Sequence, residues 1–226
     1  MSGSRRLIVA IDGPAGAGKS TVAARLAARF GLLNLETGAM YRAFALKSLE
    51  KRVEPGNASA LAQLASETSI TLEPTPSGNR VLLDGVDVTA RIRNADVTQA
   101  ASLVSVHPPI RRWMVSLQRK LGENGGVVME GRDIGTVVFP DADLKVFLDA
   151  SPEARGERRY EQTDKASPQE MILKEIRERD DRDRNRAQSP LKPAPDAVVI
   201  DSTHLTLEEV VSQVETLVTA RLAALA

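Results

Sequence analysis

The residues with the most specific chemistry lie near the N-terminus, where residues 13–20 read GPAGAGKS. This stretch fits the pattern G-x-x-x-x-G-K-[ST] at every defined position. Glycine accepts positive φ angles and has no Cβ, so successive backbone N–H groups can turn inward and surround an anion. A helix that starts near Lys19 would point the positive end of its dipole at the same place. The sequence therefore predicts a phosphate-binding loop.

Two side chains at the end of this loop indicate what it binds. Lys19 would reach the outer phosphates of a nucleotide, and the Ser20 hydroxyl would complete an octahedral Mg²⁺ shared with that nucleotide. Ser20 is therefore the predicted metal ligand. The predicted nucleotide-binding residues of the loop are Gly13, Pro14, Ala15, Gly16, Ala17, Gly18, Lys19, Ser20 and Thr21.

Arginines beside predicted strand ends and helix starts indicate a second phosphorylated ligand. Thr37 and Arg42 follow the second predicted strand, so a hydroxyl, a helix N-terminus and a guanidinium meet where a phosphate could bind. Arg132 and Asp133 follow the third strand, at the edge where parallel sheets bind ligands. A carboxylate behind the Mg²⁺ would come from Glu130 or Asp133. The structural alternatives are a capped helix with a solvated arginine and a salt bridge that holds a turn.

The densest charge run is ERDDRDRNR, at residues 178–186. On a helix, Arg179, Asp183 and Arg186 share one face, because they are spaced by four and then three residues. Composition alone favours a solvent-exposed helix whose ion pairs are worth at most about 1 kcal/mol each.

A second arginine pair lies on a helix predicted to follow the fourth strand. Arg155 and Arg159 are four residues apart, so they are neighbours on the helix surface. One could stack on a nucleotide base while the other binds phosphates. The alternative is an exposed surface helix.

Five short apolar runs alternate with helical patterns and position these residues. The runs fall at residues 7–11, 31–35, 125–133, 143–149 and 196–201. Runs buried on both faces and alternating with helices are typical of a parallel sheet that binds ligands at the carboxyl ends of its strands. The predicted fold class is α/β, a five-stranded parallel sheet covered by helices on both faces. Residues 70–93 break the alternation and predict a small antiparallel insertion.

The composition excludes several classes of protein. The chain has 226 residues, 42% hydrophobic and 27% charged, as expected of a globular protein with a sizeable core. Its 30 basic and 30 acidic residues give no net field that favours nucleic acid or an anionic membrane. The absence of cysteine excludes disulfides and thiolate chemistry. No signal peptide or membrane span is predicted, so we expect a cytoplasmic location.

A phosphate-binding loop alone leaves GTPases, ATPases, transporter motors and small kinases open. The chain contains no Asn-Lys-x-Asp guanine reader and no Leu-Ser-Gly-Gly-Gln signature, and it is too short for a helicase pair. Its arginines beside predicted strand ends and helix starts indicate a second phosphorylated ligand.

Five segments, taken in order, are more specific than the loop: GPAGAGKST, TGAMYR, GRDIGTVVFPDA, ERDDRDRNR and DSTHLTLEEV. Together they resemble the bacterial cytidylate kinases. The resemblance implies a P-loop nucleoside-monophosphate kinase that uses ATP and Mg²⁺ to phosphorylate CMP or dCMP. It also implies a monomer with one domain over residues 1–226. Within that domain it implies an acceptor-binding region at 37–122, containing the β insertion at 70–93, and a lid at 151–167.

The resemblance also assigns roles to residues at matching positions. The residues implied near the acceptor phosphate are Thr37, Arg42 and Arg132, with Arg186 also on a phosphate. Those implied around cytosine are Ser102, Arg111 and Asp133, and those at the sugar hydroxyls are Arg179 and Asp183. The lid residues implied at ATP are Arg155 and Arg159. The residues implied to act on the transferring group are Lys19, Arg132, Arg159 and Arg186.

These roles agree with the chemistry of the base. Cytosine has an N4 amino donor that the Asp133 carboxylate can accept, and O2 and N3 acceptors that suit Ser102 and Arg111. Uracil would present its O4 to the same carboxylate and be repelled. The alternatives are a kinase for UMP, dTMP or a small alcohol such as shikimate, and a nucleotide switch that regulates a partner without turnover.

Overall fold

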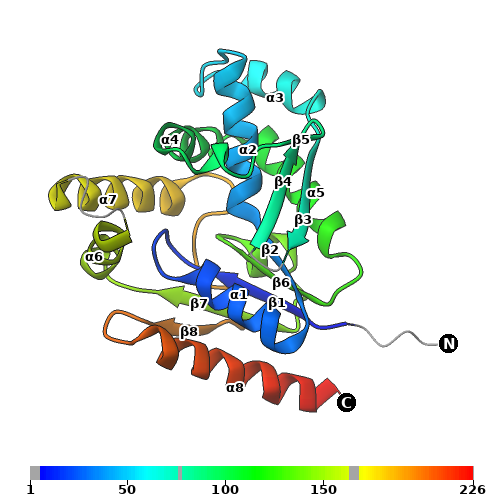
Figure 1. Ribbon diagram of the computed structural model, residues 1–226, viewed down its shortest axis with the longest axis vertical. Helices are drawn as coiled ribbons and strands as arrows, with labels where there is room; N and C mark the ends of the chain where they lie inside the picture. Colours follow the sequence, from blue (N-terminus) through cyan, green and yellow to red (C-terminus); the bar gives the residue numbers. More distant parts are fainter. Residues whose placement is uncertain (1–5, 76–77, 163–167, 226) are drawn as a thin grey trace.

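The parallel sheet is the centre of the computed structural model, which describes residues 6–75, 78–162 and 168–225. Within these residues the strands lie in the order β2-β6-β1-β7-β8, all parallel (Figure 1). Their bounds are β1 Ile8–Asp12, β2 Leu33–Glu36, β6 Val127–Gly131, β7 Leu144–Asp149 and β8 Val198–Asp201. The predicted α/β fold class is confirmed.

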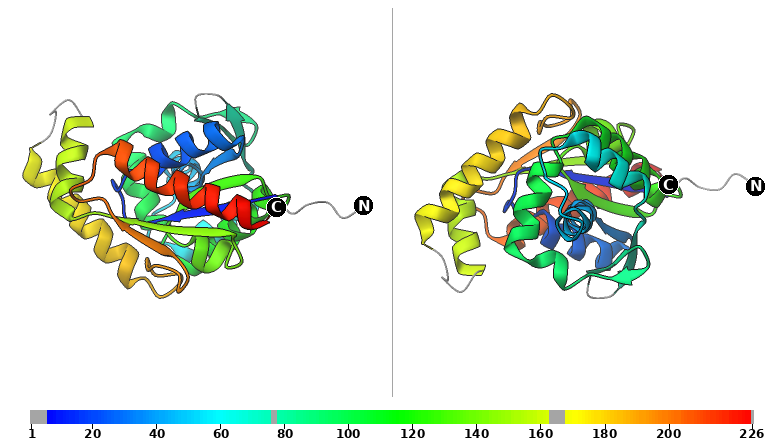
Figure 2. Two further views of the ribbon diagram at one scale, coloured as in Figure 1. Left: turned by 90° about the horizontal axis from the view of Figure 1, so that it is seen from below. Right: turned by 90° about the horizontal axis from the view of Figure 1, so that it is seen from above.

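The sheet is buried on both faces, which explains why its central strands are apolar throughout. In β1, Ile8 and Ala10 join one hydrophobic cluster, while Val9 and Ile11 join the other. Helices α1 (Lys19–Phe30) and α8 (Leu207–Leu225) cover the second cluster. Helices α2 (Thr37–Glu50) and α5 (Pro108–Gly122) cover the first. Figure 2 shows the two helix layers from opposite sides.

The predicted insertion forms a separate small sheet. Strands β3 (Ile70–Thr75), β4 (Gly78–Leu83) and β5 (Val86–Asp87) pair antiparallel in that order. Asp84 and Gly85 both have positive φ, 50° and 82°, as a two-residue hairpin requires. In the chain, α3 (Ala58–Ser66) precedes this sheet, and a 3₁₀ turn (Arg91–Arg93) and α4 (Ala95–Val104) follow it. The antiparallel insertion is therefore confirmed.

Two helices pack against each other at one side of the sheet. These are α6 (Pro152–Gln162) and α7 (Gln169–Asn185), which lie side by side in Figures 1 and 2. Helix α6 falls in the predicted lid, and residues 163–167 of that lid lie outside the described residues. None of the described helices is long and apolar enough to cross a membrane.

The sequence after Asn94 predicts helices over residues 97–106 and 110–121, with a break at Pro108 and Pro109. The structure corrects the start of the second helix, because α5 begins at Pro108. Proline is tolerated in the first turn of a helix, because the N–H groups there have no intrahelical acceptor. The two prolines therefore start the helix that carries Arg111.

Candidate active site

The phosphate loop, residues 13–21, lies at the carboxyl edge of the sheet, where residues 13–18 connect β1 to α1 and residues 19–21 begin the helix. Gly13, Gly16 and Gly18 have φ of 148°, 78° and 92°. A Cβ on Gly13 would lie 2.0 Å from the carbonyl oxygen of Leu148, so β7 approaches too closely for any side chain. Gly18 caps α1 without a side-chain hydrogen bond. The loop is therefore built from backbone and requires glycine at these places.

Lys19 and Ser20 begin α1 as predicted. The Lys19 ammonium is buried and donates to the Pro14 carbonyl at 2.7 Å. Burial and the nearby charge of Arg132 lower the pKa of Lys19 to about 7. The Ser20 hydroxyl donates to the Glu130 carboxylate at 3.0 Å. Of the two acids considered from the sequence, Glu130 is the one beside Ser20.

Asp12 is a site residue that sequence reasoning missed. Its carboxylate accepts from the backbone N–H groups of Ile134 and Gly135 at 2.8 and 2.7 Å. These residues open a π-helical turn, Ile134–Val138, after β6. Burial raises the pKa of Asp12 to about 6. The available signal was a carboxylate at the end of an apolar strand, directly before Gly13.

Thr37 and Arg42 both lie at the start of α2, beside the end of β6. The Thr37 hydroxyl donates to the Glu130 carbonyl at 2.7 Å, and a Cβ on Gly131 would meet it at 2.8 Å. Arg42 pairs with Glu36 through one guanidinium nitrogen, while its buried Nε has no partner. The structure therefore brings a hydroxyl and a guanidinium to the end of β6, where Arg132 follows.

The residues predicted around the base come from three elements. Arg111 of α5 is buried, pairs with Asp133 and donates to the Ser105 carbonyl at 3.2 Å. Its guanidinium lies 5.6 Å from the centre of the Tyr41 ring, and the buried Tyr41 hydroxyl has no partner. Ser102 of α4 is also buried. Tyr41 was not among the predicted site residues, although it stands in the TGAMYR segment.

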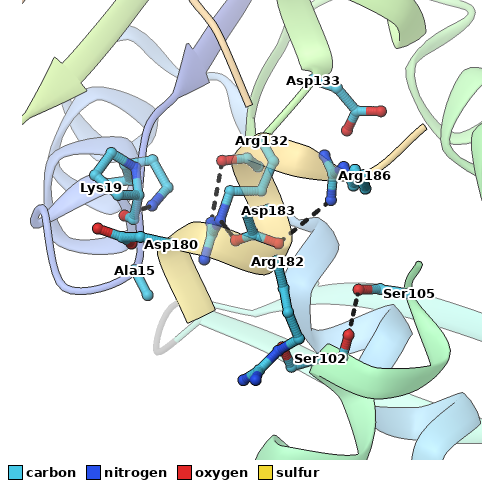
Figure 3. A network of polar contacts seen from close by, with 12 residues as sticks. Ala15, Lys19, Ser102, Ser105, Arg132, Asp133, Asp180, Arg182, Asp183 and Arg186 are labelled. Atoms are coloured by element: carbon cyan, nitrogen blue, oxygen red, sulfur yellow. Dashed lines mark hydrogen bonds and ion pairs between the residues drawn. The ribbon is translucent and has the colours of Figure 1, made fainter. Parts of the chain in front are cut away.

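Ser102 contacts a residue that the sequence analysis did not select. Arg182 of α7 donates from Nε to the Ser102 hydroxyl at 3.1 Å, so α7 reaches α4 across the site (Figure 3). The sequence feature that could have identified Arg182 is its position three residues after Arg179, on the same side of the helix.

The charged run of α7 is buried in part, contrary to the interpretation from composition. Asp180 and Asp183 are each 6% exposed, and Arg186, at the end of the helix, is 8% exposed. Figure 3 shows Asp183 between Arg132 and Arg186, which pair with it at 2.9 and 3.4 Å. Burial opposes the ionisation of Asp183, but the three arginine charges around it outweigh burial and lower its pKa.

The two arginines predicted to contact ATP differ in environment. Arg155 is fully buried at the base of α6, and its guanidinium bonds to Asp180 and to the carbonyls of Ala15 and Ala150. Arg159 lies one turn later on the same side of α6 and is exposed. The structure therefore places them in different environments, and the ATP contacts of both stay predictions.

Positive charge accumulates between the phosphate loop and α7. Burial, followed by the charge of Arg132, lowers the pKa of both Lys19 and Arg179, to about 7 and about 10. Among the described residues, several buried guanidinium nitrogens have no partner, namely Arg42 Nε, Arg111 Nε, Arg179 Nε and Arg186 Nη2. Cations that repel one another and retain unused donors form a site for a polyanion.

The comparisons with known proteins agree with this geometry. The chain matches the cytidylate kinase family model over residues 9–220. It is 49% identical over 222 residues to a cytidylate kinase from Solibacter usitatus (strain Ellin6076), covering 96% of this chain and 94% of that protein. It is also 49% identical over 221 residues to a cytidylate kinase from Geobacillus kaustophilus (strain HTA426), covering 96% and 99%.

A crystal structure of an uncharacterized protein from Eubacterium ventriosum shares the fold. The TM-score is 0.50 at 12% identity, over 95% of this chain and 99% of that one. The family model and the two cytidylate kinases cover nearly the whole chain at much higher similarity. This chain therefore belongs to the cytidylate kinase family.

Proposed function

We propose that this protein transfers the γ-phosphoryl group of ATP to the 5′-phosphate of CMP or dCMP, giving ADP and the diphosphate. The observation that carries the proposal is the cation cluster between the phosphate loop and α7. Lys19 at the loop and Arg179 on α7 both have lowered pKa values, in part because of the same neighbour, Arg132. Phosphates on both sides of Arg132 would relieve this repulsion, as a reaction between two phosphorylated molecules requires.

In the proposed reaction the protein positions and neutralises charge. An oxygen of the acceptor phosphate bonds to the γ-phosphorus while the bond to the β–γ bridging oxygen breaks and ADP leaves. No general base is needed, because the acceptor phosphate is largely deprotonated near pH 7. We assign Lys19, Arg132, Arg159 and Arg186 to the developing negative charge, with Thr37 and Arg42 at the acceptor phosphate. A lid over both ligands would exclude water and suppress hydrolysis of ATP.

The donor atoms near the start of α1 fit Mg²⁺. Ser20 supplies a hydroxyl oxygen and Glu130 a carboxylate oxygen, 3.0 Å apart, and oxygen is the ligand atom that this ion prefers. Among the described residues there is no group of three acidic, histidine or cysteine side chains that could hold a metal alone. We therefore propose that Ser20 binds the ion together with nucleotide phosphates, with Glu130 orienting Ser20. Bound there, Mg²⁺ would neutralise charge on the phosphates.

The base specificity follows from the pair formed by Asp133 and Arg111. Arg111 donates to one oxygen of Asp133, and the Asp133 carboxylate can accept the N4 amino group of cytosine. Ser102 and Arg111 would donate to the base acceptors. At the sugar hydroxyls, Arg179 would donate and Asp183 would accept. We further propose a monomer in the cytoplasm, where ATP and nucleoside monophosphates occur; sedimentation equilibrium tests the oligomeric state.

The function is tested by measuring ADP production from Mg-ATP with CMP, dCMP, UMP, dTMP, AMP or no acceptor, each at about 1 mM. We expect strong stimulation by CMP and dCMP alone. Stimulation by a different acceptor would retain the kinase and reject the cytosine assignments. Hydrolysis that no acceptor stimulates would favour a nucleotide switch.

A further inference from the structure

Arg155 connects three parts of the molecule that the proposed reaction must coordinate. It lies in α6, within the predicted lid, and its side chain has no exposed surface. Its Nε donates to the carbonyl of Ala150, at the end of β7, at 2.9 Å. Its Nη1 donates to Ala15 of the phosphate loop and to Asp180 of α7, both at 3.0 Å. A second bond, from Nη2, completes a two-pronged pair with Asp180.

The bond to Ala15 fixes the orientation of one peptide in the phosphate loop. A peptide bond is planar and trans, so its carbonyl and N–H point in opposite directions. When Arg155 holds the Ala15 carbonyl, the N–H of Gly16 must point the other way. Gly16 has a φ of 78°, and a Cβ built on it would lie 3.3 Å from the Cβ of Arg155. The guanidinium and the close packing therefore act on the same peptide.

Lys19 holds the preceding carbonyl, that of Pro14, in the same manner. That bond must break when Lys19 turns to the phosphates of a nucleotide, whereas the bonds of Arg155 involve none of the predicted phosphate-binding side chains. Arg155 can thus keep the loop in its anion-binding form both before and after nucleotide binds.

The bond to Asp180 extends this restraint to the acceptor side. Asp180 is buried on α7, one turn before Asp183 (Figure 3). It follows Arg179 directly in sequence, and Arg179 and Asp183 are the two residues assigned to the sugar. A planar guanidinium that pairs through two nitrogens restricts rotation and sliding more than a single bond does. The base of α6, the phosphate loop and the middle of α7 are therefore held together as one unit.

We propose that Arg155 is a positioning residue that holds the phosphate loop in its anion-binding form and, through Asp180, links that loop to the acceptor site. Its guanidinium does not contact ATP. The role proposed here for Arg155 replaces its predicted contact with ATP. It depends on the proposed function in one respect only, the assignment of α7 to the acceptor site.

The test measures binding of Mg-ADP, and separately of magnesium pyrophosphate, by titration calorimetry without acceptor. The variants are Arg155→Lys, Asp180→Asn and the double variant. Lysine retains the charge that Asp180 requires but cannot donate to Ala15, Ala150 and Asp180 together. We expect each single variant to weaken both probes about 10-fold, the equivalent of one charged hydrogen bond. The double variant should be no weaker than the single ones, because both changes release the same peptide.

The matched control is Glu153→Gln. Glu153 pairs with Arg177 at 2.8 Å between the same two helices, but both side chains are exposed, 61% and 58%. Breaking this pair should leave both affinities within about twofold.

Three results would overturn the proposal. The first is wild-type affinity in folded Arg155→Lys. The second is weaker binding of Mg-ADP with unchanged pyrophosphate affinity, which would show that Arg155 contacts the nucleoside. The third is an unchanged affinity for both probes in Asp180→Asn. If Arg155→Lys does not fold, the affinities of Asp180→Asn test the proposal in its place. Because no acceptor is present, none of these results depends on CMP being the substrate.

Discussion

The phosphate loop and the charged run of α7 face each other across the candidate site, and the groups that they offer to anions differ. The loop uses backbone N–H groups, held by glycines at positive φ and by one buried lysine. The charged run uses side chains in a network of buried ion pairs, with Asp183 shared by Arg132 and Arg186. A backbone site depends on the absence of side chains, whereas a side-chain site depends on every partner being present.

This difference determines how each region should respond to substitution. In the loop, adding a single Cβ disturbs the fold, while removing the lysine disturbs only the chemistry. In the ion-pair network, removing either partner leaves the other charge buried without compensation. The following predictions separate these two kinds of site.

Lys19→Ala should have the largest effect on activity. We expect a loss of kcat/KM on the order of 10³-fold or more, because Lys19 is the loop's cation at the outer phosphates. Stability should be unchanged or higher, since burial disfavours this ammonium enough to lower its pKa to about 7. A coupled ADP assay and urea unfolding measure the two quantities. A kcat/KM within tenfold of the wild-type value would show that Lys19 does not act on the transferring phosphoryl group.

Gly13→Ala should test the backbone character of the loop. A Cβ would lie 2.0 Å from the Leu148 carbonyl at a φ of 148°, so we expect a destabilisation of about 3 kcal/mol or more. The control is Gly56→Ala, where nothing lies within 4 Å of the added Cβ. Urea unfolding of both variants gives the comparison. Equal stabilities would mean that the approach of β7 does not restrict the loop.

The buried Asp12 carboxyl should make the stability of the folded protein depend on pH. Its pKa is raised from 3.8 to about 6, so the folded state binds a proton that the unfolded state releases between these values. The associated stability is complete below pH 3.8 and is lost as pH rises through 6. Relative to Asp12→Asn, the wild type should lose about 2.4 kcal/mol between pH 4 and pH 7. A pH-independent difference between the two unfolding curves would contradict the buried carboxyl.

Asp133→Asn should change specificity more than rate. An asparagine amide can still accept from Arg111 while its NH₂ group donates to O4 of uracil. We expect the ratio of kcat/KM for CMP over UMP to fall about 10- to 100-fold, with UMP activity rising. Asp181→Asn, an exposed position on α7, serves as the control. An unchanged ratio would show that Asp133 does not distinguish cytosine from uracil.

Much of the loop side was predictable because its signals are local. The preceding apolar run, the glycine spacing and the helix predicted to start near Lys19 are consecutive in sequence, and β1 and α1 were found there. The sequence predicted that either Glu130 or Asp133 would lie beside Ser20, and it did not distinguish between them. The position of Glu130 depends on β6 lying next to β1, a pairing between residues more than a hundred positions apart.

The charged run of α7 was harder to predict from the sequence, because composition does not distinguish a buried charge from an exposed one. Read as a helix in isolation, residues 178–186 favour solvent, and only the resemblance to a known family reversed that interpretation. The contact of Arg182 with Ser102 joins residues 80 positions apart, and that of Arg155 with Ala15 joins residues 140 apart. No local pattern carries such information.

Glycine geometry, hydrophobic periodicity and helix signals act over a few neighbouring residues. The elements, the phosphate loop, the resemblance to the family and most candidate residues could therefore be predicted from the sequence. Which charges are buried, and with which residues they pair, depends on the packing of distant segments. Packing α6 and α7 together beside the sheet removes Arg155, Asp180 and Asp183 from water. A charge removed from water must find a partner, and here the partners come from distant parts of the chain.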